Sequence, residues 1–204
     1  MKIIFRIVVL GFSLALIVGT SSAQHKSKHS TQKIKFDYGI IEGSNYENHF
    51  FGFHLTLPDG WQTQSGKTTQ SHITSKNDKN SVIALSSFRY ENKDRILYNP
   101  SIAILFENIR QKKKIKTAQA YLEDTVKRIE NIQSNIPVEI EGEVFEAEIG
   151  GKKFAALQTE ILGVVEQRYY VFLSRGYAVV FLVSHASEED EETLDKVLKS
   201  LKFY

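Results

Sequence analysis

Four lysines lie within five positions of this 204-residue chain and form its strongest local charge cluster. They are Lys112, Lys113, Lys114 and Lys116. The cluster directly precedes a helical pattern that begins at Thr117, and cations are mildly unfavourable near the positive end of a helix dipole. A run of charge without a pattern is usually a solvated loop. The alternative is contact with an anionic surface, such as lipid headgroups, a polysaccharide or an acidic protein. These lysines are therefore our candidate partner-binding residues.

Three other segments carry residue types that bind phosphate or metal ions elsewhere. Gly60 to Thr68 resembles a phosphate-binding loop, but five residues separate its glycines where that loop needs four. The acidic run 188–192 has calcium-type ligands, but helix capping and the helix dipole already explain acids there. The two histidines of the segment 25–29 are metal-ligand types on a lead that does not preorganise them. We expect no cofactor and no metal ion.

The sequence contains no catalytic motif that we can identify. It has no cysteine, no histidine pair at i, i+4 with a glutamate between, and no serine in a nucleophile-elbow pattern. A serine triad or a carboxylate pair is assembled in space, so the sequence leaves such a site open. With no acid, base or nucleophile set apart by its context, the sequence favours a binding protein over an enzyme.

The first 23 residues are typical of a cleavable signal peptide. Lys2 and Arg6 precede an apolar run over 7–18, and Ser21 and Ala23 occupy the −3 and −1 positions of a cleavage site. The run is shorter than the roughly 20 apolar residues that span a bilayer, although an uncleaved anchor is the alternative. We expect a periplasmic or extracellular protein whose mature chain lacks a transmembrane span.

The mature chain of 181 residues would carry equal numbers of basic and acidic residues, 24 of each, once the signal peptide is removed. This balance gives no electrostatic argument for nucleic-acid binding, and we expect no nucleic-acid partner. The absence of cysteine also excludes disulfides and cysteine-linked lipid. We expect a flexible lead over 24–45, with a short extended piece at 34–41, and a single domain over 46–204.

Alternating or continuous apolar residues predict seven strands in this domain. A strand at 50–57 precedes a polar loop at 62–80. The other predicted strands are 81–90, 101–109, 138–149, 152–162, 166–173 and 177–186. Gly150-Gly151 and Ser174-Arg175-Gly176 predict hairpin turns, and a change of phase near Gly142 predicts a β-bulge.

Helical spacing of apolar residues predicts two helices. The first begins after Thr117 and reaches about residue 134. The second is capped by Ser187, has an acidic first turn, and carries an apolar stripe that we expect to face the sheet. The stripe consists of Leu194, Val197, Leu198 and Leu201.

Both ends of the domain resemble bacterial PsbP-like domains. The first motif runs from Tyr46 through Gly52-Phe53 to Leu57-Pro58-Asp59-Gly60-Trp61, and the second is the acidic helix start followed by 198–203. The resemblance implies an α+β fold, an antiparallel sheet of six or seven strands with helices on both faces in an α/β/α sandwich. Proteins of this fold include accessory subunits of photosystem II, a Ran-binding nuclear import factor and bacterial envelope proteins, which mostly bind other proteins.

We therefore expect an exported, non-enzymatic binding or accessory protein of the bacterial cell envelope that docks a protein partner. One alternative is a hydrolase whose site is assembled across strands. The other is a carrier of a small ligand or lipid. We expect the functional surface in the loops 62–80 and 91–100 and around the lysine cluster.

Overall fold

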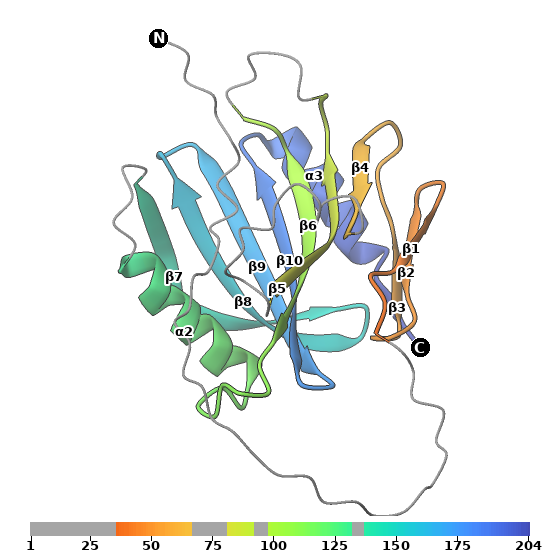
Figure 1. Ribbon diagram of the computed structural model, residues 1–204. Helices are drawn as coiled ribbons and strands as arrows, with labels where there is room; N and C mark the ends of the chain where they lie inside the picture. The colour runs from red at the N-terminus through yellow and green to blue at the C-terminus, as the bar shows by residue number, and fades with distance from the viewer. Residues whose placement is uncertain (1–35, 67–80, 92–97, 132–136) are drawn as a thin grey trace, which may run out of the picture.

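The computed structural model describes residues 36–66, 81–91, 98–131 and 137–204 (Figure 1). Within these residues the chain forms two antiparallel sheets, of seven and four strands, and two helices. The architecture is α+β and mostly strand, as the sequence predicts. The predicted signal peptide, most of the predicted lead and the histidines at 25 and 29 lie outside the described residues.

The larger sheet is built mainly from consecutive antiparallel neighbours, and β10 lies at its centre between β6 and β9. Nearly all of β10 is buried, because its residues are apolar on both faces. The strands follow in the spatial order β4 (Gln62–Ser65), β5 (Ser81–Phe88), β6 (Ser101–Asn108), β10 (Tyr177–His185), β9 (Val165–Ser174), β8 (Lys152–Ile161) and β7 (Val138–Ile149).

The smaller sheet joins the two ends of the described chain (Figure 1). Its strands are β1 (Ile40–Glu42), β2 (Asn45–Asn48), β3 (Phe53–Thr56) and β11 (Lys202–Phe203). The last residue closes this pairing, since the amide of Tyr204 donates to the carbonyl of Gly52 at 3.1 Å. Residues 36–45, part of the predicted lead, include β1 and Phe36, which packs against the core.

Two segments at the start of the domain differ from the sequence prediction. The predicted strand at 50–57 is a strand only over β3, in the smaller sheet, because Phe50 and Phe51 lie in a turn and are both buried. Gly52 permits that turn with a φ of +70°, and a Cβ there would lie 2.8 Å from the carbonyl oxygen of Tyr204. The predicted loop at 62–80 begins instead with β4, an edge strand of the larger sheet; residues 67–80 lie outside the described part.

The predicted hairpins and the bulge are confirmed. Gly150-Gly151 connects β7 to β8, and the register between these strands shifts between Glu141 and Phe145, beside Gly142. Arg175 and Gly176 both have positive φ, at 52° and 81°, as the type I′ turn between β9 and β10 requires.

Both predicted helix caps are present. The hydroxyl of Thr117 accepts from the amide of Ala120 at 3.0 Å and starts α2 (Ala118–Glu130), which is shorter than predicted. The hydroxyl of Ser187 accepts from the amide of Asp190 at 3.3 Å and starts α3 (Glu188–Lys199). Each cap satisfies a backbone donor that the first helical turn leaves free.

The core of the described residues consists of two clusters that use alternate residues of the central strands, as period-two side-chain alternation requires. The first cluster contains the buried stripe of α3, many aromatic rings, and Phe154, Ala156, Val179, Phe181 and Val183 of the larger sheet. The second contains Tyr121 and Leu122 of α2 with Ala155, Leu157, Val171, Ala178 and Val180. The helices are thus held by side-chain packing on the strands as well as by their own hydrogen bonds.

Candidate functional site

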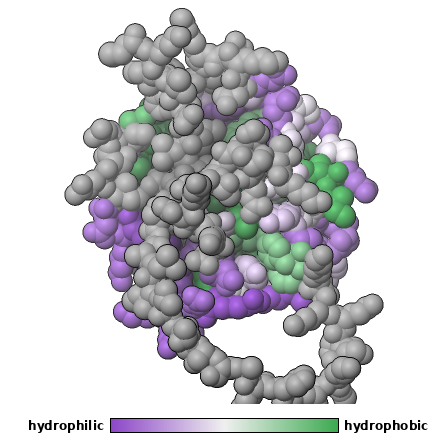
Figure 2. Space-filling model, viewed as in Figure 1, coloured by the Kyte–Doolittle hydropathy of each residue, from purple (hydrophilic) through white to green (hydrophobic). Residues whose placement is uncertain are grey.

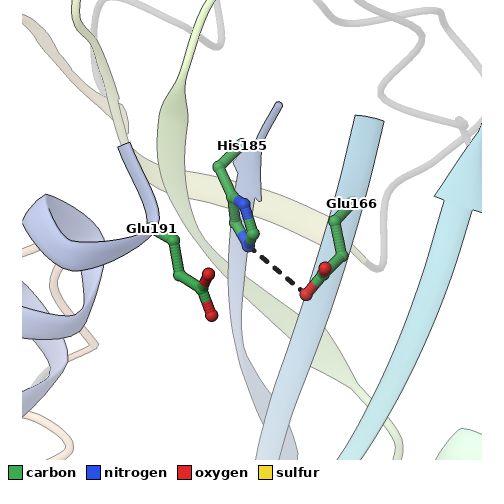
Figure 3. Close-up of side chains that lie close together, drawn as sticks. All are labelled: Glu166, His185 and Glu191. Carbon is green, nitrogen blue, oxygen red and sulfur yellow. Dashed lines mark ion pairs between the residues drawn. The ribbon is translucent and has the colours of Figure 1, made fainter. Parts of the chain in front are cut away.

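A histidine and two glutamates from three elements converge beside the N-terminal end of α3 (Figure 3). His185 ends β10, and the strand register places it directly opposite Glu166 of β9. Residues opposite each other on antiparallel strands project from the same face, so both side chains meet α3, which supplies Glu191. One ligand atom from each of the three lies within 4.8 Å of the others. We call Glu166, His185 and Glu191 the carboxylate–histidine cluster.

His185 is the most deeply buried member of the carboxylate–histidine cluster, with a side chain that is 6% exposed. Its Nε2 lies 3.4 Å from Oε1 of Glu166 (Figure 3) and forms no hydrogen bond within the described part of the chain. A buried ring nitrogen without a hydrogen bond is uncommon, since burial of an unpaired polar atom costs about 1–3 kcal/mol. The Nε2 atom of His185 therefore lies close to a carboxylate of the cluster but forms no hydrogen bond with it.

Arg168 holds the two glutamates of the cluster together. Its Nε lies 2.6 Å from Oε1 of Glu166, and another of its nitrogens donates to Oε1 of Glu191. The hydrogen bond from Arg168 lowers the pKa of Glu191 below its ordinary value of 4.5. Glu191 therefore remains ionised at neutral pH.

Two further carboxylates surround this group. Glu160 of β8 lies directly opposite Glu166 in the sheet register, and Asp195 approaches Arg168 at 3.9 Å. Like charges opposite each other on neighbouring strands repel, and the guanidinium of Arg168 pairs with three carboxylates here, those of Glu166, Glu191 and Asp195. This face of the sheet therefore carries an excess of negative charge.

The structure divides the acidic run 188–192 among separate roles that the sequence does not distinguish. Asp190 completes the helix cap, accepting from the hydroxyl of Ser187 at 2.7 Å, and also pairs with Arg89. Glu189 pairs with Arg89 as well, at 2.6 Å. Glu191 points instead to the carboxylate–histidine cluster, which capping does not explain.

Sequence reasoning missed the carboxylate–histidine cluster because its members are separated in the chain and belong to three elements. The apolar strands around Glu166 and His185 indicate only a hairpin. Pairing the predicted strands outward from the Ser174–Gly176 turn would have placed these two residues opposite each other. No local pattern would have added Glu191.

The four predicted partner-binding lysines differ in their surroundings. Lys112 is only 18% exposed and forms an ion pair with the buried carboxylate of Glu107, which also accepts from the hydroxyl of Tyr121 at 2.7 Å. Lys113, Lys114 and Lys116 are exposed. The ion pair between Lys112 and Glu107 thus anchors the loop to the sheet, and the other three lysines remain exposed to solvent.

Two arginines join these lysines at the same end of the larger sheet. Arg110 donates to the carbonyl of Arg175 at 2.9 Å and lies over the ring of Tyr177, while Arg175 lies over the ring of Phe50. We call Arg110, Lys113, Lys114, Lys116 and Arg175 the basic end. None of these five residues forms an ion pair with a carboxylate of the described residues. The sequence did not associate Arg175 with the lysines, because the sheet alone brings it there.

The surface near the basic end is hydrophilic. In Figure 2 the described surface at the lower left, where α2 and its preceding loop lie in Figure 1, consists mainly of hydrophilic residues. Among the helices of the described chain, none has the length and apolar character needed to cross a bilayer.

Comparison with solved structures identifies the fold. The chain is similar to the solution structure of cyanobacterial PsbP from Synechocystis sp. PCC 6803, with a TM-score of 0.51 and 16% identity, over 84% of this chain and 99% of that one. It also matches LpqN of Mycobacterium tuberculosis, a protein involved in cell envelope biogenesis, with a TM-score of 0.39 and 16% identity over 79% and 85% of the two chains. No protein-family model and no curated protein sequence matches. The fold is PsbP-like, as the sequence resemblance implies, and at this identity the likeness is one of fold alone.

Proposed function

We propose that this chain, with its PsbP-like fold, is an exported accessory protein of the bacterial cell envelope that docks an acidic protein partner on its basic end. Export rests on the predicted signal peptide over 1–23, and the envelope role on the resemblance to accessory proteins. The observation that carries the docking site is the group of five exposed or half-exposed cations without a carboxylate partner in the described chain. Unpaired charge of one sign on a nearly neutral protein favours a partner of the opposite sign.

The start of α2 strengthens the positive potential at the basic end. The first turn of α2 contains no acidic residue, whereas the first turn of α3 contains four. The partial positive charge of the α2 dipole is therefore left without an acidic side chain, and lysines precede it instead. Cations placed against this dipole cost a few tenths of a kcal/mol, a cost that binding an anionic partner would reverse.

The loop that carries the lysines is already ordered. Its buried Ile115 joins the second core cluster, and the amides of Lys112 and Ile115 donate to the carbonyls of Ile109 and Lys112 at 2.9 and 3.0 Å. The ion pair between Lys112 and Glu107 adds a second anchor. A preordered loop loses less entropy when it binds, so Lys112 supports docking by positioning its three exposed neighbours.

We propose in addition that the larger sheet is covered by helices on both faces, in an α/β/α sandwich. The support is the alternation of the two core clusters: Leu157 and Val180 pack with α2, whereas the neighbouring Ala156 and Val179 belong to the cluster of α3. In this arrangement both faces of the central strands are committed to packing. The ends and edges of the sheet are then left for partners.

The test compares two charge-reversal variants of the full chain. The variant K113E/K114E/K116E removes the exposed lysines of the basic end, and the control K196E/K199E/K202E reverses three exposed lysines on α3 and β11. Cross-linking in the native envelope, followed by mass spectrometry, should identify an acidic protein linked to the wild type and to the control. The basic-end variant should lose that link at least tenfold.

Three results would count against this function. Equal cross-linking by both variants would remove the basic end as the docking site. Co-sedimentation with anionic but not neutral vesicles, lost in the basic-end variant, would assign the surface to lipid instead. Turnover on a hydrolase substrate panel without any specific cross-link would favour the enzyme alternative.

A further inference from the structure

We propose that the carboxylate–histidine cluster is a binding site for a divalent first-row transition-metal ion, of which Zn²⁺ is the representative. Its imidazole nitrogen suits transition metals, and its carboxylate oxygens are also ordinary ligands for Zn²⁺. This inference concerns a different surface from the basic end and is independent of partner docking.

The unsatisfied nitrogen of His185 is the observation that separates this site from an ordinary acidic surface. Its side chain is 6% exposed, and its Nε2 forms no hydrogen bond in the described structure while lying 3.4 Å from Oε1 of Glu166. A neutral imidazole nitrogen is a metal ligand, and coordination would satisfy it within the buried site. A metal ion would therefore satisfy a nitrogen that lies near Glu166 but forms no hydrogen bond in the described chain.

The distances fit an ion after a closing movement of one ligand. Ligand atoms bound to one tetrahedral Zn²⁺ at about 2.1 Å lie about 3.4 Å apart, whereas those of the carboxylate–histidine cluster lie within 4.8 Å of one another. The side chain of Glu191 is 35% exposed and has room to move inward, whereas His185 is fixed by burial. The movement needed is therefore at most about 1.4 Å, which a rotation of the half-exposed glutamate side chain can supply.

Charge also favours a cation at this site. Besides Glu166 and Glu191, Glu160 lies opposite Glu166 in the sheet register. Asp195 of α3 lies 3.9 Å from Arg168 and 4.0 Å from the exposed Lys199. A divalent ion would reduce the repulsion between these carboxylates. Binding would thus relieve an electrostatic cost already present in the fold.

Arg168 leaves room for the ion while holding its ligands in place. Its hydrogen bonds to Glu166 and Glu191 both use Oε1, and no hydrogen bond to the second oxygen of either carboxylate is found among the described residues. Metal-ligating carboxylates are commonly oriented by hydrogen bonds from such outer residues. Arg168 is therefore a positioning residue of the site.

The test is calorimetric titration of the full chain with ZnCl₂. The substitutions H25Q and H29Q are present in every sample, because the histidines of the lead are a competing source of metal ligands. The parent protein should bind one Zn²⁺ per chain, and E191Q and H185Q should each weaken binding at least tenfold. E192Q is the matched control: it removes the same charge from an exposed neighbour on α3 and should leave the affinity unchanged within twofold.

Circular dichroism of each variant excludes unfolding as the cause of weaker binding, and the half-exposed E191Q keeps the test decisive if the buried H185Q does not fold. Substitution with Co²⁺ should give visible absorption bands that H185Q or E191Q abolishes. Absence of a single-site isotherm in the parent would overturn the proposal. Equal losses in E191Q and E192Q would overturn it as well, because they would show general electrostatic attraction without a built site.

Discussion

Replacing Leu198 with alanine should destabilise the domain by about 2–5 kcal/mol. Leu198 is 6% exposed and belongs to the first core cluster, where the stripe of α3 packs on the larger sheet. The substitution removes three carbon atoms beyond Cβ. At about 0.8 kcal/mol for each buried methylene, their transfer to water accounts for roughly 2.4 kcal/mol, and the cavity left behind adds to it.

The size of the cavity term follows from the neighbours of Leu198. Leu194, Val197 and Leu201 of the same stripe are also buried, in a cluster that contains aromatic rings of β3, β8, β9 and β10. Rings held on strands relax less than a single aliphatic side chain on a free surface, so the cavity should persist. We therefore expect a value in the middle of the range or above.

Urea unfolding of the full chain, followed by far-ultraviolet circular dichroism, measures this loss. The midpoint should fall with an unchanged m value, and the melting temperature should fall by roughly 2–4 °C for each kcal/mol. Lys196→Ala on the exposed side of α3 is the matched control and should change the free energy of unfolding by no more than about 0.5 kcal/mol. A loss below about 1 kcal/mol for Leu198→Ala would refute the packing of α3 described above.

Three further predictions concern a hairpin turn, the N-terminal cap of α3 and the pH dependence of stability. Gly150→Ala should lower the melting temperature more than Gly151→Ala. Both glycines have positive φ, but only at Gly150 would a Cβ lie 2.3 Å from the carbonyl oxygen of Leu201. Equal shifts of the melting temperature would contradict this clash. Ser187→Ala should cost about 1 kcal/mol in urea unfolding, since it removes the acceptor that caps α3, and a loss near zero would show that the cap is dispensable. Glu191→Gln should be less stable than wild type above pH 4.5, and the difference in the free energy of unfolding should shrink as the pH falls further. The reason is that the pKa of Glu191 in the folded state lies below its ordinary 4.5. A difference independent of pH down to pH 2 would contradict the pairing with Arg168.

The elements that the sequence predicted well have causes within a few residues of each other. Thr117 and Ser187 cap the two helices because a side-chain oxygen meets an amide three residues later. Gly142 and Gly176 adopt the positive φ values that a bulge and a type I′ turn require. Local stereochemistry is therefore sufficient for these features.

The segment 50–65 was harder to predict because its apolar pattern has two explanations. Alternation over 50–57 is typical of a strand, yet Phe50 and Phe51 are buried in a turn that packs on the aromatic core. The polar residues of β4 resemble a loop, yet they pair with β5 at the edge of the sheet. In both cases tertiary packing outweighed the local pattern.

The sequence by itself determined the α+β class, the hairpins, the helix caps and the resemblance to PsbP-like domains, because all of these arise from short-range spacing. Only the tertiary structure decided which side chains meet. It placed His185 opposite Glu166 and brought Glu191 to both, paired Lys112 with Glu107, and added Arg175 to the basic end. Strand register and helix docking are fixed by the summed packing of the whole core, so no local pattern specifies these contacts, and both candidate sites are built from them.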